Sequence, residues 1–125
     1  MARRRNRDDG AAAVEFALLL VPLLVLVLGI ISVGRAYFEL VTLTNSAREG
    51  ARTMAIKKDV DAAKAQAVQA APGLAIDASN VDVNTATCPP DTDVTVTVAK
   101  PFTFWFFVGA QTLTLTGQGV MRCGG

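Results

Sequence analysis

The stretch GAAAVEFALLLVPLLVLVLGIISV, residues 10–33, decides the fold of this 125-residue chain. No charged residue occurs from Phe16 to Val33, and a helix of that length spans about 27 Å, close to the hydrocarbon thickness of a bilayer. We therefore expect a transmembrane helix over residues 11–34. Glu15 stands at its entrance, where an ionised carboxylate costs about 2–3 kcal/mol on insertion scales and less near the interface. The positive end of the helix dipole offsets part of this cost, so a place among the lipid headgroups is one interpretation of Glu15.

The residues on either side of this stretch predict how the chain lies in a membrane. Residues 1–10 form a basic leader with arginines at positions 3, 4, 5 and 7. Arginines just before an apolar segment favour a cytoplasmic amino terminus, so residues 35–125 should lie outside the cytoplasm. An ordinary signal-anchor is an alternative, and a secretory signal peptide cleaved before Tyr37 is another. The second is less favoured because signal peptides usually have a shorter apolar core, of about 7–15 residues.

A stripe of apolar residues extends the predicted helix beyond the membrane. These residues recur at steps of three and four, at Ala36, Leu40, Leu43, Ala47, Ala51 and Met54. The period predicts one helix from about Ala11 to Ile56, and the outer half of that helix needs a packing partner. Pro22 should kink the helix or loosen one of its turns.

A second, shorter helix is expected after this one. Lys57 and Lys58 suit a helix end, and Asp59 suits the cap of the next helix. That helix should run from Val60 to Ala71 and end at Pro72 and Gly73. Residues 35–71 should thus form an extracytoplasmic helical part.

Residues 72–125 change to a period of two, which is typical of half-buried strands. The alternating apolar residues are Val81 and Val83, then Val94, Val96 and Val98, and finally Leu113 and Leu115. A turn at residues 88–91 and a connection over residues 100–110 should separate the three strands. The pattern predicts an α+β fold, in which a small antiparallel sheet covers the apolar stripe of the long helix.

The residue inventory bears on chemistry as well. Cys88 and Cys123 would, if bonded, bracket the sheet, and an extracytoplasmic location permits a disulfide. The chain has no histidine, its acidic residues show no paired arrangement, and it has no Gly-rich phosphate loop. We therefore expect no enzymatic activity, no metal, no cofactor and no small-molecule substrate. A net charge of +1 argues against a nucleic-acid partner.

Gly10 gives Glu15 a second interpretation. Glu15 is the fifth residue after this glycine, and the segment resembles the processing site of type IV prepilins, which a membrane peptidase cuts after the glycine. Such a cut would create an ammonium group at Ala11. The Glu15 carboxylate of one subunit and the Ala11 ammonium of another would then neutralise each other in the apolar core of a fibre. Because a misplaced subunit would leave a buried charge unpaired, this pairing would set the axial register.

Three segments together resemble TadE-like proteins, which are pseudopilins or minor pilins of the tight-adherence (Tad, or Flp) pilus machinery. They are residues 10–22, the pair Gly34-Arg35 and the block NSAREGAR at residues 45–52; the carboxy-terminal half is also similar. The resemblance implies a role in pilus assembly and surface adherence, in the bacterial cell membrane or in the pilus itself. It implies as partners the lipid bilayer, a prepilin peptidase, other pilins or pseudopilins and the Tad secretion machinery.

The resemblance also assigns roles to particular residues. It implies cleavage between Gly10 and Ala11, with Glu15, Phe16 and Pro22 as recognition and assembly positions. The main alternative is a single-pass envelope protein without a pilus role, whose external domain binds another molecule.

Two further surfaces are candidate interfaces. Gly50 costs about 0.5–1 kcal/mol in a helix relative to alanine, so we expect a close backbone approach there. The neighbouring charges Arg48, Glu49 and Arg52 would contact the small domain or another subunit, or would form a solvated face.

The second surface is aromatic, with Phe102, Phe104, Trp105, Phe106 and Phe107 close together in the chain. It is either a partly buried core loop or a contact with the outer leaflet or another pilus component.

Overall fold

The computed structural model describes residues 5–106 and 109–124, and the side chains within that range except those of residues 5–9 and of Phe106. The chain divides into two compact units, Met1–Gly34 and Arg35–Gly125. Helix α1 (Arg5–Lys57) begins in the first and ends in the second. Its start at Arg5 lies before the expected start near Ala11, because Gly10 weakens a helix by only about 1 kcal/mol and so does not end it. The helix is uninterrupted at Pro22.

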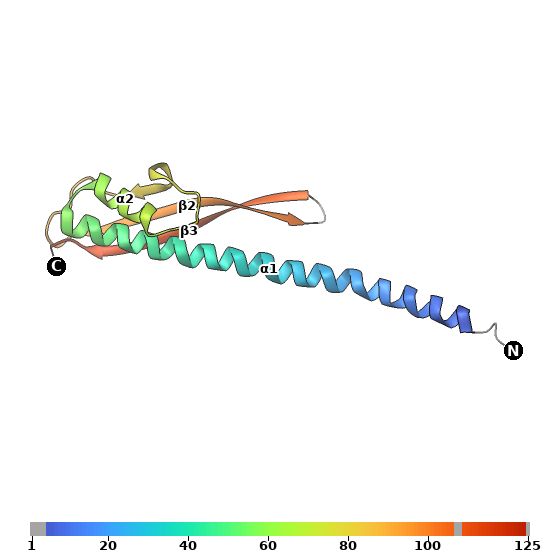
Figure 1. The fold of residues 1–125 in the computed structure, drawn as a ribbon. Coiled ribbons are helices and arrows are strands. Elements are labelled where there is room, and N and C mark those ends of the chain that lie inside the picture. Colours follow the sequence, from blue (N-terminus) through green and yellow to red (C-terminus); the bar gives the residue numbers. More distant parts are fainter. Residues whose placement is uncertain (1–4, 107–108, 125) are drawn as a thin grey trace. The chain divides into compact units, whose positions relative to one another are not determined.

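The predicted apolar stripe of α1 is the core of the second unit. Within that unit the sheet lies along one side of α1 (Figure 1). Leu43, Ala47, Ala51 and Met54 are fully buried, whereas Ala36 and Leu40 are half-buried. The sheet supplies the packing partner that the stripe required, and the predicted α+β fold is confirmed.

Helix α2 (Val60–Gln69) is shorter than predicted. Asp59 caps it as expected, because its side chain accepts hydrogen bonds from the backbone N–H groups of Asp61 at 2.9 Å and Ala62 at 3.2 Å. The helix ends before Ala71 because a following proline, here Pro72, disfavours helical backbone in the residue that precedes it.

The sheet has the order β1-β2-β3 and is antiparallel throughout. Its strands are β1 (Val81–Val83), β2 (Asp93–Phe106) and β3 (Gly109–Arg122). The prediction that residues 100–110 form a connection was wrong, since β2 and β3 remain paired as far as Phe106 and Gly109. The period-two signal fails there because proline and clustered aromatics replace the alternation of apolar and polar residues.

Pro101 is compatible with this long strand because β1 pairs only with residues 96–98 of β2. Beyond Val98 the outer edge of β2 has no partner among the described strands, so the missing N–H of proline costs no ladder hydrogen bond on that side.

A short 3₁₀ helix, η1 (Ala78–Asn80), leads into β1 and is capped by Asp77. The Ser79 hydroxyl and then the Ser79 backbone N–H donate to the Asp77 carboxylate, and together they hold its pKa below the ordinary value of 3.8. The cap stabilises the turn that aligns β1 with β2.

Two glycines bring β3 against the backbone of α1. Gly117 and Gly119 alternate with exposed residues and lie on the buried face of the strand. A Cβ atom at Gly119 would lie 2.5 Å from the Arg48 backbone nitrogen, and one at Gly117 would lie 2.6 Å from the Leu43 carbonyl oxygen. No side chain fits in this space, so glycine is required for the helix and strand to approach so closely.

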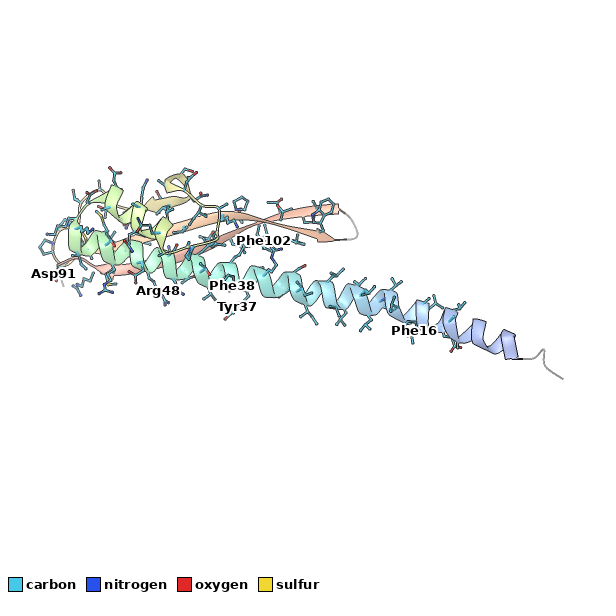
Figure 2. All side chains as sticks on the ribbon, viewed as in Figure 1. Phe16, Tyr37, Phe38, Arg48, Asp91 and Phe102 are labelled. Atoms are coloured by element: carbon cyan, nitrogen blue, oxygen red, sulfur yellow. A yellow bond between two sulfur atoms is a disulfide. The ribbon has the colours of Figure 1, made fainter. Side chains whose placement is uncertain are left out.

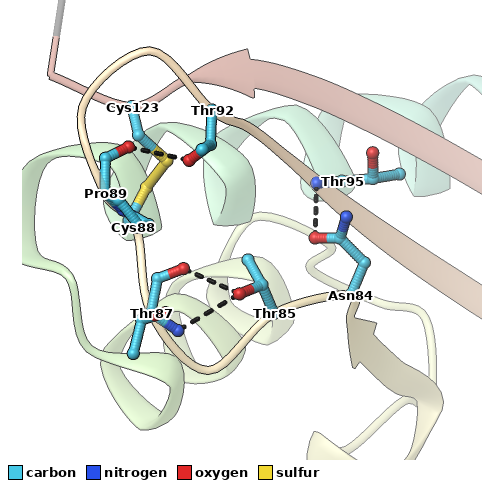
Figure 3. Close-up of a disulfide and its surroundings, with 8 residues drawn as sticks. All are labelled: Asn84, Thr85, Thr87, Cys88, Pro89, Thr92, Thr95 and Cys123. Carbon is cyan, nitrogen blue, oxygen red and sulfur yellow. Dashed lines mark hydrogen bonds between the residues drawn. A yellow bond between two sulfur atoms is a disulfide. The ribbon is translucent and has the colours of Figure 1, made fainter.

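The expected disulfide between Cys88 and Cys123 is present. Figure 3 shows it beside the loop from β1 to β2, where the Thr92 hydroxyl donates to the Pro89 carbonyl oxygen at 2.7 Å. The bond joins residues 35 apart in sequence, and closing a loop of that length stabilises a fold by about 3–4 kcal/mol in the chain-entropy model. It thereby fixes the end of β3 to the loop that precedes β2.

Candidate functional site

The predicted processing and assembly residues all lie on α1, in the Met1–Gly34 unit. Gly10, Ala11, Glu15, Phe16 and Pro22 are each solvent-exposed in the single chain. Phe16 is labelled in Figure 2 and has 66% of its surface exposed. A Cβ atom at Gly10 would meet nothing within 4 Å. These residues are therefore free to contact a lipid, a peptidase or another subunit.

The apolar part of α1 is compatible with single-pass membrane anchoring. Among the described residues, α1 is the one helix long and apolar enough to cross a bilayer, and its most apolar window is not buried at all. A core helix of a soluble protein would be mostly covered by its own chain. The apolar surface needs cover from outside this chain, which lipid or other helices can provide.

The bond between Gly10 and Ala11 lies inside helix α1. Glycine makes local unwinding at this bond easier by about 0.5–1 kcal/mol relative to alanine. Cleavage would replace the neutral Ala11 amide by an ammonium group and leave the first four N–H groups of the shortened helix without helical partners. Both changes concentrate positive charge one helical turn from Glu15.

The block from Arg48 to Arg52 divides between the core and the surface of the second unit. A Cβ atom at Gly50 would lie 3.1 Å from the Ala67 Cβ and 3.3 Å from the Ala63 carbonyl oxygen, so α2 packs closely on this glycine. Arg48, Glu49 and Arg52 are exposed. Within the described part of the chain, none of these three forms an ion pair.

The aromatic residues of β2 have different environments. Phe102 is buried, and Phe104 is half-buried against the same core cluster. Trp105 points to the other face of the sheet, with 81% of its surface exposed. The side chain of Phe106 and all of Phe107 lie outside the described residues. The expected core loop is thus a strand that buries one face and leaves its tryptophan uncovered.

Sequence reasoning missed a charged cluster that joins the sheet to the helix. The Lys100 ammonium donates to Glu39 Oε2 at 2.9 Å, and the Arg35 guanidinium lies 4.0 Å from Glu39 Oε1. The side chains of Glu39 and Lys100 are only 10% and 19% exposed. An uncompensated charge at such a site is costly, so the pair fixes β2 against α1 at the end of the unit that begins with Arg35.

This pair gives a prediction about stability. Lys100→Met should destabilise the Arg35–Gly125 unit by about 2 kcal/mol, less than the roughly 3–5 kcal/mol of a fully buried pair because some water reaches both groups. The double variant Lys100→Met, Glu39→Gln should regain at least half of this loss. Calorimetry of the full chain in detergent measures both. Equal losses in the single and double variants would show that the charge of Glu39 plays no part.

Comparison with known families supports the resemblance that the sequence showed. Residues 10–52 match the family model described as TadE-like protein. The match includes Gly10, Glu15, the apolar segment and the block that ends at Arg52, so the resemblance noted in the sequence is confirmed over these residues. No curated protein and no solved structure matches the chain.

Proposed function

We propose that this chain, whose residues 10–52 match TadE-like proteins, is a minor pilin or pseudopilin of a Tad (Flp) type IV-like pilus. It acts in pilus assembly and, through the pilus, in surface adherence. The single observation that carries the proposal is this match, because it includes both Gly10 and Glu15. The uncovered apolar surface of α1 supports it, since subunits that pack side by side through such helices would bury that surface.

Assembly proceeds in three steps. The chain is first stored in the membrane with its leader in the cytoplasm and residues 35–125 outside. A prepilin peptidase then hydrolyses the bond after Gly10, which removes the arginines of the leader and creates the Ala11 ammonium. The processed helix finally packs against the helices of neighbouring subunits, where the Ala11 ammonium of one subunit pairs with Glu15 of another.

The pairing of these two charges selects the register. In an apolar environment an unpaired ammonium or carboxylate costs several kcal/mol. A subunit shifted by one helical turn would leave both groups unpaired, whereas the correct register satisfies both. In the unprocessed chain the Ala11 nitrogen is a neutral amide, so it cannot form an ion pair with Glu15 of a neighbouring subunit.

The processing step is tested by the mass of the mature protein. In cells with an active prepilin peptidase, the chain should begin at Ala11, and without the peptidase it should keep its leader. Gly10→Val should also keep the leader, because the valine side chain would hinder the peptidase from binding the bond that it cuts. Intact-mass spectrometry of the membrane fraction measures all three.

A matched control separates processing from damage to the helix. Gly29→Val places the same side chain on the same helix, at a glycine where a Cβ likewise meets nothing within 4 Å. It should be processed normally. A wild-type chain that begins at Met1 in peptidase-positive, piliated cells would favour a simple envelope anchor, and one that begins at Tyr37 would indicate secretion.

A further inference from the structure

We propose that the hairpin end, residues 102–106 and 109–112, inserts into the headgroup region of the membrane that α1 of the same chain crosses. This would give the external domain a second contact with lipid. The inference rests on the membrane span of α1 and is independent of the pilus role.

The first observation is the distribution of aromatic residues. Apart from Phe16, every aromatic residue in the chain falls at residues 37–38 or 102–107. The fold brings these two segments together, and Figure 2 shows Phe102 beside the part of α1 that carries Tyr37 and Phe38. Residues 39–101 and 108–125, which form most of the external domain, contain no aromatic residue. All of the domain's aromatics therefore gather at one end.

The second observation is the direction in which β2 runs along α1. Along β2, Val94 shares a core cluster with Met54, Lys100 pairs with Glu39, and Phe102 shares a core cluster with Ala36. The strand therefore runs back along α1 toward Arg35, which directly follows the apolar segment. From Phe102 to Phe106 it continues for about 13 Å at about 3.3 Å per residue. The hairpin end thus extends from the end of the second unit at which Arg35 lies.

The third observation is the chemistry of this end. No charged residue occurs from Pro101 to Met121. Tyr37 and Phe38 are each 69% exposed and Trp105 is 81% exposed. Tyrosine and tryptophan are enriched at the membrane interface, where an apolar ring with a polar group is at home. Exposed aromatic residues of this kind, gathered at the end of the unit that begins directly after the apolar segment, fit the headgroup layer of the bilayer.

Charged residues lie next to these aromatic residues in the fold. Lys100, on β2, pairs with Glu39, and the Arg35 side chain is 73% exposed. A guanidinium at this level suits the phosphates of lipid headgroups. The bilayer is favoured over a second copy of the chain because covalent attachment holds every copy next to it.

The experiment uses the one tryptophan of the chain as a reporter. Trp105 is the only tryptophan in the sequence, so the fluorescence of the full-length chain in phosphatidylcholine vesicles reports on the hairpin end alone. We expect a blue-shifted emission, weak quenching by acrylamide and a loss of most of the intensity with lipids brominated near the headgroup end of their acyl chains. Lipids brominated near the chain terminus should quench less.

A relocated tryptophan provides the control. The double variant Trp105→Phe, Val120→Trp moves the reporter along the same hairpin to an exposed position that pairs with Thr95. Its emission should be that of an indole in water, with no quenching by brominated lipid. If Trp105 emits as in water and brominated lipids do not quench it, the proposal is wrong. A blue shift without lipid quenching would also overturn it and would point to a second copy as the occupant.

Discussion

A Glu15→Gln chain should enter the membrane, lose its leader and yet fail to assemble. The substitution keeps the size and shape of the side chain and removes only its charge. The Ala11 ammonium of a neighbouring subunit would then be buried without a counter-charge, at a cost of about 3–5 kcal/mol. This corresponds to a loss of roughly 10²–10⁴-fold in incorporation. Counting pili by electron microscopy and quantifying the sheared pilus fraction measure the effect.

Two controls make this result specific to charge pairing. The amino terminus of the Glu15→Gln chain should be Ala11, which shows that the peptidase still recognises it. Glu49→Gln makes the same chemical change at an exposed position of the same helix, outside the apolar segment, and should keep most of the pili. Wild-type piliation by the Glu15→Gln chain would contradict the role given to this carboxylate.

A Gly119→Val chain should fail to form the folded unit Arg35–Gly125. Overpacked cores usually cost about 1–3 kcal/mol because neighbouring side chains adjust. Here the new Cβ would meet the backbone of Ala47 and Arg48, which moves only if β3 lifts away from α1. We therefore expect a loss of about 4–5 kcal/mol or more, a large part of the roughly 5–15 kcal/mol that stabilises a typical domain.

Calorimetry of the full chain in detergent should show that the unfolding transition of the Gly119→Val domain is absent or far below the wild-type temperature. Gln118→Val is the matched control, because this exposed residue is adjacent on the same strand and points to the other face. It should change stability by no more than about 0.5 kcal/mol. A Gly119→Val domain as stable as this control would show that the close approach of β3 and α1 is not required.

Sequence patterns predicted those parts of the fold in which a single local signal decides the structure. The uncharged stretch from Phe16 to Val33 indicated the apolar helix, and the stripe through Leu43 and Ala47 indicated its buried face. The valines of β2 indicated the middle of the sheet because one face of that strand is buried and the other is not. Gly10 and Glu15 were singled out in the same way, since their spacing along one helix is a local property, and their roles stay predictions.

The rest depended on which segments meet in space. The Glu39–Lys100 pair joins residues 61 positions apart, and only the packing of β2 on α1 brings them together. Gly117 and Gly119 did carry a signal, because they continue the inward-facing positions of Leu115 at a period of two. The length of the hairpin was missed because four successive aromatic residues, 104–107, remove the alternation that identifies a strand.

The most direct test of the account measures contact between Glu15 and the amino terminus of a neighbouring subunit. Dicyclohexylcarbodiimide enters apolar regions and activates a carboxylate, which then forms an amide with an amine in direct contact while the reagent leaves as dicyclohexylurea. Trypsin would then release residues 11–35 as one peptide, because this segment contains no earlier lysine or arginine. For assembled pili we predict this peptide joined, through its Ala11 or its Glu15, to the amino-terminal peptide of a neighbouring subunit, and no product joined through position 15 from Glu15→Gln. Assembled subunits that retain residues 1–10, or a link formed only within single peptides, would contradict the account.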